Sequence, residues 1–349
     1  MDCYNRTRLL LQFHITGRCN LRCKHCYRTE GDVEPLSYDE VIRVLEQFKE
    51  LLRQYNADSS RPRRGHVNLT GGEPFIREDI REILTYLGDN KAYFTYGILS
   101  NGSFLNDETV ALLRQTEVSF VQMSLDGDRA VHDSLRALGD YDRVLQTAEW
   151  LERCGIRTYI SFTAIAENDR YLPTVAKECR RRGITKLWSD RLVPIGNGED
   201  LAALSITREQ LPAYLQYLKK AQGTAWQRWR YPKTQVTANR ALQFLRARGE
   251  VYACSAGDTL ITVDEFGNIL PCRRMPIVCG NVAQTTLLEV YRSHEVFRQL
   301  RTKAIPRECA ACPYAYLCRG GARCQAYARW QSFFRADPAC PLVQPTDKR

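Results

Sequence analysis

The 349-residue sequence predicts an α/β fold with a parallel sheet, followed by a small cysteine-rich segment. Two observations support this prediction. From about residue 9 to 195, short apolar runs of β-forming residues alternate with amphipathic helical stretches, which is the pattern of a parallel sheet. From Cys254 to Cys340 this alternation has stopped, and the chain carries eight cysteines.

Six strands are expected in the first part of the chain: 9–15, 66–70, 94–100, 119–125, 157–164 and 185–193. One helix is marked by a capping box of Ser37 and Glu40. Its 3.6-residue period places six apolar residues on one face: Val41, Val44, Leu45, Phe48, Leu51 and Leu52. Gly155 and Gly183 stand where helices end in a left-handed residue, and a strand follows each of them.

The composition changes after Pro194, so we divide the chain into residues 1–200, a helical bridging region at 201–253, and a C-terminal domain at 254–349. In the last part, 259–263 and 268–270 predict a hairpin, and 287–301 predicts a helix. A segment under about 100 residues buries little core, and bound metals commonly stabilise such segments.

The composition, 44% hydrophobic and 26% charged, is that of a packed globular protein. We expect a cytoplasmic protein with no membrane partner, because the sequence has neither a signal-like N-terminus nor a run of about 18 apolar residues. In that compartment fourteen cysteines favour metal ligation over disulfides. The net charge of +10 fits either an acidic partner or a well-solvated surface. Residues 226–233 are basic and aromatic but match no nucleic-acid module, so no nucleic-acid partner is expected.

Three cysteines, Cys19, Cys23 and Cys26, form a C-x3-C-x2-C pattern directly after the first expected strand. Iron–sulfur cubanes use four ligands, so three cysteines would leave one iron open to a substrate or cofactor. A zinc site is the alternative. Zinc sites usually close with a fourth Cys or His, and His25 is the residue available for that.

The cysteine pattern resembles that of the radical S-adenosylmethionine (SAM) superfamily. The resemblance implies a partial (β/α)6 barrel whose three catalytic cysteines hold a [4Fe-4S] cluster, with SAM chelating the open iron through its amino and carboxylate groups. It also implies an enzyme that cleaves SAM to a 5′-deoxyadenosyl radical. Further positions match the family in order at the ends of successive strands, where a barrel places its chemistry.

The resemblance assigns SAM-binding roles to these positions. Gly71 and Gly72 would let SAM approach the backbone, and Glu73 would meet its ammonium group. Ser100 lies in a segment similar to the ribose-side segment of relatives, although Ser-Asn-Gly also forms tight turns. Ser124 and Asp126 resemble the next strand-end pair, with a loop cap as the alternative.

Four further residues receive roles from the same resemblance. Arg136 stands where relatives present a guanidinium to the SAM carboxylate, a contact that favours bidentate Arg geometry. Arg191, at the end of the sixth strand, would lie near the adenine pocket or form an ordinary ion pair. His25 and Tyr27 would wall the SAM pocket or only pack within the loop.

The C-terminal cysteines match the auxiliary-cluster extension called SPASM. By this resemblance one auxiliary cluster is held by Cys309, Cys312, Cys318 and Cys340. The other would use Cys254 and Cys272, but its usual third position is Ala322 here, and Cys324 is the natural replacement. Either Cys279 completes this set, or one iron stays open to a substrate thiolate, and we favour the open iron. Both auxiliary clusters are expected to be [4Fe-4S], and Cys3, Cys154 and Cys179 lie outside both patterns.

The resemblance implies oxidative maturation of a ribosomally made peptide or protein, such as a thioether or carbon–carbon cross-link. An external one-electron donor of the flavodoxin or ferredoxin type is expected, with either direct substrate recognition or a separate leader-peptide recognition protein. The alternative is a small-molecule reaction, such as tetrapyrrole side-chain decarboxylation or cofactor assembly for a metalloenzyme. Sulfatase maturation is disfavoured, because relatives with that activity carry an Asp base where Arg273 stands.

Overall fold

The computed structural model describes residues 8–28, 36–57 and 59–343, so Cys3 lies outside the described residues. Their strands form a 10-stranded sheet in the order β10-β9-β8-β1-β2-β3-β4-β5-β6-β7. The strands are β1 (Leu10–Thr16), β2 (Gly65–Gly71), β3 (Phe94–Leu99), β4 (Val121–Ser124), β5 (Thr158–Ala164), β6 (Lys186–Arg191), β7 (Gln235–Thr237), β8 (Leu260–Val263), β9 (Asn268–Leu270) and β10 (Gly280–Asn281).

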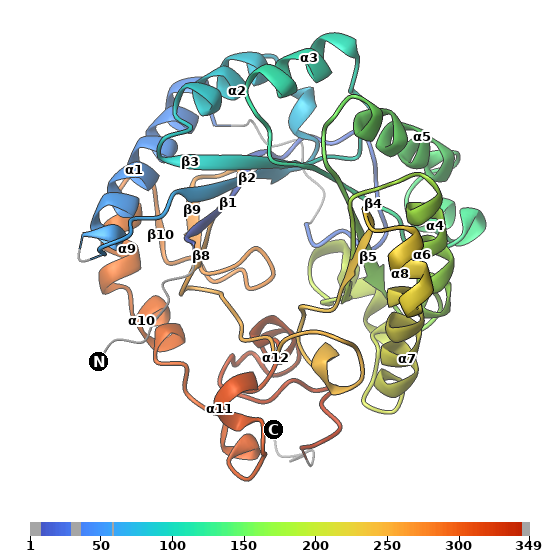
Figure 1. The fold of residues 1–349 in the computed structure, drawn as a ribbon. Helices are drawn as coiled ribbons and strands as arrows, with labels where there is room; N and C mark the ends of the chain where they lie inside the picture. The colour runs from blue at the N-terminus through green and yellow to red at the C-terminus, as the bar shows by residue number, and fades with distance from the viewer. Residues whose placement is uncertain (1–7, 29–35, 58, 344–349) are drawn as a thin grey trace.

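The central strands β1 to β6 pair in chain order and are all parallel. All six were expected from the sequence, with ends that differ by at most two residues. The sheet curves into an arc with helices along its outer side, and the arc does not close (Figure 1). The predicted fold class, a partial α/β barrel followed by a cysteine-rich segment, is therefore confirmed.

The helices that cover the arc follow the strands in sequence. They are α1 (Tyr38–Asn56), α2 (Ile80–Asp89), α3 (Asp107–Gln115), α4 (Arg129–Leu135), α5 (Asp140–Arg153), α6 (Leu172–Arg181) and α7 (Leu211–Gln222). The capping box of α1 is confirmed: Glu40 N donates to Ser37 Oγ at 3.3 Å, and Ser37 N donates to Glu40 Oε2 at 2.8 Å. Gly155 and Gly183 end helices with φ of 82° and 62°, as expected.

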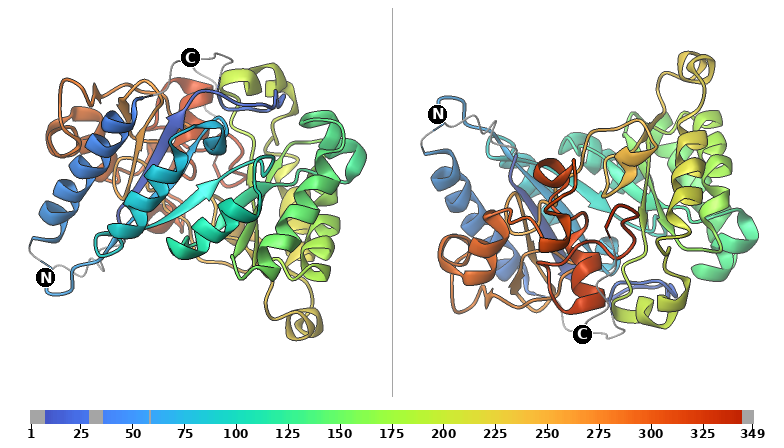
Figure 2. Two further views of the ribbon diagram at one scale, coloured as in Figure 1. Left: turned by 90° about the horizontal axis from the view of Figure 1, so that it is seen from above. Right: turned by 90° about the horizontal axis from the view of Figure 1, so that it is seen from below.

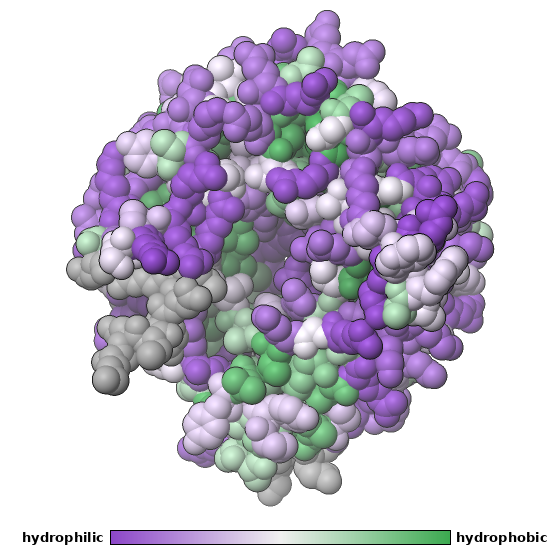
Figure 3. Space-filling view, in the orientation of Figure 1, coloured by the Kyte–Doolittle hydropathy of each residue, from purple (hydrophilic) through white to green (hydrophobic). Residues whose placement is uncertain are grey.

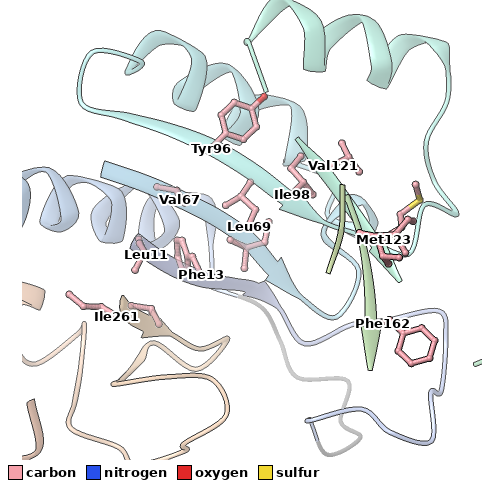
Figure 4. Close-up of a cluster of buried hydrophobic side chains, with 14 of the residues drawn as sticks. Leu11, Phe13, Val67, Leu69, Tyr96, Ile98, Val121, Met123, Phe162 and Ile261 are labelled. Atoms are coloured by element: carbon pink, nitrogen blue, oxygen red, sulfur yellow. The ribbon is translucent and has the colours of Figure 1, made fainter. Parts of the chain in front are cut away.

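The two faces of the curved sheet carry different side chains because strand residues alternate in direction. Alternate residues such as Leu11, Val67 and Ile98 are fully buried in the apolar core (Figure 4). Strand residues that point the other way, such as Gln12 and Gln122, line an interior cavity instead. A closed eight-stranded barrel is filled by such inward residues, whereas this open arc keeps space at its centre.

The C-terminal part begins with the expected hairpin, but this hairpin joins the barrel sheet. Strand β8 pairs in parallel with β1, from Leu10 opposite Leu260 to Phe13 opposite Val263. The remaining helices are α8 (Ala225–Arg230), α9 (Leu287–Ser293), α10 (Glu295–Arg301), α11 (Ala315–Cys318) and α12 (Arg323–Trp330). The orange helix α9 lies beside α1, and the red segment that carries α11 and α12 lies across the open side of the arc (Figures 1 and 2).

Two expectations from the sequence require correction. The single helix expected at 287–301 is wrong, because the chain is extended at His294 (φ −66°, ψ 131°), which separates α9 from α10. His294 Nδ1 accepts a hydrogen bond from Val296 N at 3.3 Å and so caps α10. The bridging region 201–253 is not purely helical, because β7 extends the sheet in parallel to β6.

A buried ion pair joins the C-terminal segment to the barrel. Arg191, the last residue of β6, donates to both carboxylate oxygens of Asp337 at 3.0 and 2.5 Å, and the two side chains are 3% and 0% exposed. Removing one member of such a pair leaves a buried charge without compensation.

We predict that Asp337→Asn lowers the free energy of unfolding by about 3–5 kcal/mol. The matched control is Glu108→Gln, which breaks the exposed pair with Arg81 and should cost less than about 1 kcal/mol. Urea unfolding followed by circular dichroism measures both changes. Equal effects of the two substitutions would contradict the structural role of the buried pair.

Candidate active site

The loop that carries Cys19, Cys23 and Cys26 follows β1 and is fixed by its backbone. Gly72 N donates to the Thr16 carbonyl at 2.9 Å, and Glu73 N donates to the Arg18 carbonyl at 2.8 Å. Further along, Lys24 N donates to Leu135 O at 2.9 Å, and Gly198 N donates to Cys26 O at 2.9 Å. Segments from β2, α4 and the turn after β6 therefore hold the loop in place.

The three cysteines line one cavity of about 220 Å³ at the carboxyl ends of the strands, called the first cavity below. It also brings together most of the residues predicted for SAM binding: His25, Tyr27, Gly71, Gly72, Ser100, Ser124 and Arg136. Several lining residues were not predicted: Arg22, Arg28, Thr70, Gln122, Ser161, Thr163, Trp188, Asn197, Arg273 and Arg274. Strand alternation could have identified Thr70, Gln122, Ser161 and Thr163, because each points to the polar face of its strand.

Both glycines of the Gly-Gly pair are required by close backbone approach. A Cβ on Gly72 would lie 1.9 Å from the Arg18 carbonyl oxygen. Gly71 has a φ of 124°, and a Cβ there would lie 2.2 Å from Thr16 O. Only glycine fits between this wall of the cavity and the cysteine loop.

Glu73 lies behind the cavity wall and does not line the cavity. Its carboxylate is fully buried and accepts hydrogen bonds from Ser100 Oγ at 2.8 Å, Asn101 N at 2.6 Å and Phe75 N at 3.2 Å. Burial raises the pKa of Glu73 to about 7. The carboxylate thus joins the ends of β2 and β3, and a direct contact with a SAM ammonium group would require these bonds to change. Ser100 Oγ also accepts a hydrogen bond from Gly102 N at 2.8 Å, so the tight turn that was the alternative for this segment is formed beside the cavity.

Asp126 is fully buried and positions two residues of the cavity wall. It accepts hydrogen bonds from Arg136 Nε at 2.6 Å and Thr163 N at 2.7 Å, and His25 Nε2 lies 3.2 Å from Oδ2. Burial opposes ionisation, but Arg136 and His25 together hold the pKa of Asp126 well below its usual range. The Arg136 guanidinium also lies 3.7 Å from Cys23 Sγ. A cation is thus fixed directly beside the cysteine loop.

Three further predicted residues, Ser124, His25 and Arg191, lie in different surroundings. Ser124 Oγ lies 2.8 Å from Ser161 Oγ at the cavity wall. His25 Nδ1 is buried and has no hydrogen-bond partner in the described part of the chain. Arg191 does not line the first cavity, because its guanidinium is bound by Asp337, so its adenine contact stays a prediction.

A larger second cavity, of about 1220 Å³, adjoins the first. The two share Tyr27, Arg28 and Arg273, and the second is bounded by the turn after β6, the β8–β9 turn and α12. Glu265, in the β8–β9 turn, accepts from Arg28 Nη2 at 2.5 Å and lies 3.2 Å from His14 Nδ1. The space-filling view shows a hollow at the centre of the molecule, with apolar residues below it (Figure 3).

The C-terminal cysteines lie in two groups. Cys254, Cys272 and Cys324 line a third cavity, of about 150 Å³, inside the barrel. The other group, which surrounds a small apolar cavity, is Cys309, Cys312, Cys318 and Cys340. Cys279 lines neither cavity, and its Sγ donates to Ile277 O at 3.4 Å.

These cysteines fit iron–sulfur clusters. Every cysteine in the described residues is a free thiol, and each predicted set lines a common void. Over the same residues, no three His, Cys, Asp or Glu side chains converge as ligands of one metal ion. Ligands of a multi-atom cluster must stand around a space that the cluster fills, which is the arrangement found.

The chain matches two protein-family models. Residues 13–179 match the radical SAM superfamily, and residues 254–313 match SPASM, an iron-sulfur cluster-binding domain. The chain is therefore a radical SAM enzyme. More narrowly, it belongs to the radical SAM enzymes with a SPASM domain, and its cofactors are SAM, a SAM-binding [4Fe-4S] cluster and auxiliary iron–sulfur clusters. The zinc alternative is not supported.

Relatives of two kinds cover nearly the whole chain. An AdoMet-dependent heme synthase of Oleidesulfovibrio alaskensis is 27% identical over 97% of this chain and 88% of its own length. Mycofactocin maturase MftC of Mycolicibacterium smegmatis is 27% identical over 95% of this chain and 82% of its own length. The crystal structure of Streptococcus suis SuiB bound to its precursor peptide SuiA shares the fold, with a TM-score of 0.70, 17% identity and coverage of 97% and 76%.

No helix in the described residues is both long enough and apolar enough to cross a bilayer.

We predict that Gly72→Ala weakens SAM binding at least about ten-fold, because the new Cβ must push the glycine strand away from the cysteine loop. Equilibrium dialysis of labelled SAM against anaerobically reconstituted enzyme measures the affinity, and iron per chain checks that the cluster is retained. The control is Gly139→Ala, where a Cβ meets nothing within 4 Å: its φ of 79° should cost some stability, but SAM affinity should be retained. Unchanged SAM affinity in Gly72→Ala would refute the assignment of this wall.

Proposed function

We propose that this enzyme abstracts a hydrogen atom from a ribosomally made peptide or protein and installs an oxidative modification, such as a thioether or carbon–carbon cross-link. The observation that carries the proposal is the second cavity, which adjoins the first and shares three lining residues with it. Its volume of about 1220 Å³ exceeds the roughly 300–1,000 Å³ of ordinary small-molecule pockets. A segment of polypeptide can enter such a space.

The residues of the first cavity have distinct tasks in this proposal. Cys19, Cys23 and Cys26 would hold the SAM-binding cluster, and Arg136 would bind the SAM carboxylate beside Cys23. When bound, the cluster and SAM would supply the 5′-deoxyadenosyl radical needed to remove one hydrogen atom from the substrate. Asp126 would keep Arg136 oriented, and the narrow first cavity would limit access of water to the reacting carbon.

The auxiliary cysteines would serve the second half of the reaction. After loss of a hydrogen atom, formation of a new bond to carbon releases one further electron and a proton. The electron would pass to the auxiliary clusters, and a donor of the flavodoxin or ferredoxin type would supply the electron that starts the next turnover. A set of three cysteines, Cys254, Cys272 and Cys324, would leave one iron open to a substrate thiolate.

A small-molecule substrate is the second candidate, because relatives of both kinds match this chain equally well. An AdoMet-dependent heme synthase matches over 97% of this chain, at the same identity as the peptide maturase. The reaction would then fall on a tetrapyrrole side chain within the same two cavities, or in the assembly of a metalloenzyme cofactor.

Substrate-dependent formation of 5′-deoxyadenosine separates the two candidates. We expect peptides encoded beside the gene to raise its rate above the background of substrate-free enzyme, and porphyrins with propionate side chains to leave it unchanged. Chromatography of anaerobic reactions with SAM and dithionite measures the product. Stimulation by porphyrins alone would replace the peptide proposal with the tetrapyrrole reaction.

We predict about twelve irons per chain after anaerobic reconstitution, falling to about eight in the triple alanine variant of Cys19, Cys23 and Cys26. Iron and acid-labile sulfide assays on the same samples give both numbers. A wild-type value well below twelve would mean that the three-cysteine set at Cys254, Cys272 and Cys324 holds a smaller cluster or none, and the open-iron proposal would fail.

We predict that Cys279→Ser retains the iron content of the wild type, because this thiol faces the Ile277 carbonyl and lines neither auxiliary cavity. The matched variant Cys324→Ser should lose iron from the auxiliary cluster inside the barrel. Mössbauer spectra distinguish loss of that cluster from general damage. Loss of a cluster in Cys279→Ser would make Cys279 its fourth ligand.

A further inference from the structure

Most arginines around the three cavities have their charge compensated by a buried or half-buried acid. Four pairs have N–O distances of 2.5–2.6 Å: Arg28 with Glu265, Arg136 with Asp126, Arg191 with Asp337 and Arg274 with Asp190. Bringing an arginine out of water is costly unless an opposite charge offsets the lost hydration. In each of the four pairs, an acid from another segment of the chain supplies this opposite charge.

Arg273 does not follow this pattern. Within the described residues it forms no hydrogen bond or ion pair, and its guanidinium lies over the Tyr27 ring, 5.1 Å from the ring centre. Arg273 is half-buried, and an arginine side chain stays charged in a protein. The described residues therefore offer no acid to this guanidinium.

Arg273 lies where the three cavities meet. It lines the first, second and third cavities, which no other residue does among those described as lining them. It follows Cys272 directly in sequence and lies above Tyr27, which follows Cys26. A substrate group bound to it would lie between the SAM-binding loop and the auxiliary cysteines.

We propose that Arg273 is the specificity-determining residue that binds a carboxylate of the substrate at the junction of the three cavities. This inference rests on the proposed function, because it concerns the substrate of the same site. A guanidinium offers paired N–H donors whose spacing matches the two oxygens of a carboxylate. An acidic side chain of a peptide and a propionate of a tetrapyrrole present the same group.

The test is a binding comparison on the reconstituted holoenzyme with SAM, using two pairs of probes. One pair is a short, fluorescently labelled Glu-rich peptide and its Gln counterpart, followed by anisotropy. The other is coproporphyrin III, which carries four propionates, and its tetra-amide, followed by fluorescence quenching. The wild type should bind the acid of at least one pair about ten-fold or more tightly than its neutral counterpart, and the preferred pair identifies the source of the carboxylate.

Three variants connect this preference to Arg273. Arg273→Gln should abolish it by weakening only the acid, and Arg273→Lys should retain part of it, because the charge remains without the paired donors. Arg329→Gln is the matched control, since Arg329 lines the second cavity but is exposed and stacks on Trp330. It should retain the full preference. Iron content is compared throughout, and Arg273→Lys serves as the test if Arg273→Gln loses the neighbouring cluster.

The inference would be overturned if the wild type prefers neither acid, or if the preference survives in Arg273→Gln. It would also be overturned if Arg329→Gln removes the preference equally, or if Arg273→Gln weakens SAM binding ten-fold, since SAM would then be the ligand. Peptide-dependent formation of 5′-deoxyadenosine by the wild type tests the proposed function separately. An enzyme that a peptide stimulates, but that prefers neither acid over its neutral counterpart, would keep that function and lose this inference.

Discussion

The arrangement of the site depends on β1 being paired in parallel on both of its sides. β2 pairs with one edge and β8 with the other, although β8 lies about 250 residues further along the chain. Because parallel strands end at the same edge of a sheet, the cysteine loop after β1, the Gly-Gly segment after β2 and the turn after β8 meet there. The register between Phe13 and Val263 therefore also sets where the chain leading to Cys272 begins.

Because the barrel is not closed, the polar face of its sheet can line the cavities of the site. In a closed barrel the inward residues fill the interior, and the site is confined to the loops. Here Gln122 and Trp188 face the open interior and are joined by a 3.0 Å hydrogen bond from Trp188 Nε1. Both residues line the first and third cavities, so the path between the SAM-binding loop and the barrel-side auxiliary cysteines runs through the barrel. A filled interior would separate them.

The parts of the structure that could be predicted are those encoded locally. The six strands and the cap at Ser37 follow from periodicity and spacing within short windows, whereas the cysteine sets were inferred from the resemblance to a family. What could not be predicted joins distant segments: β8 beside β1, Asp337 bound to Arg191, and Glu265 bound to Arg28. The surroundings of Glu73 were not predictable for a related reason, since its hydrogen bonds to Ser100 and Asn101 depend on how β2 and β3 pair. No sequence pattern distinguishes a carboxylate inside a cavity from one behind its wall.

Charge compensation in the interior links stability to function. Asp126, Asp190, Glu265 and Asp337 each offset an arginine, so most of the buried positive charge is balanced by the fold itself. An interior guanidinium without an acid destabilises the folded state, and natural proteins retain such costs mainly where activity requires them. A ligand that supplies the missing negative charge binds the folded state alone and stabilises it by mass action. At Arg273 the negative charge would come from the proposed substrate carboxylate, so binding of that substrate would stabilise the folded enzyme.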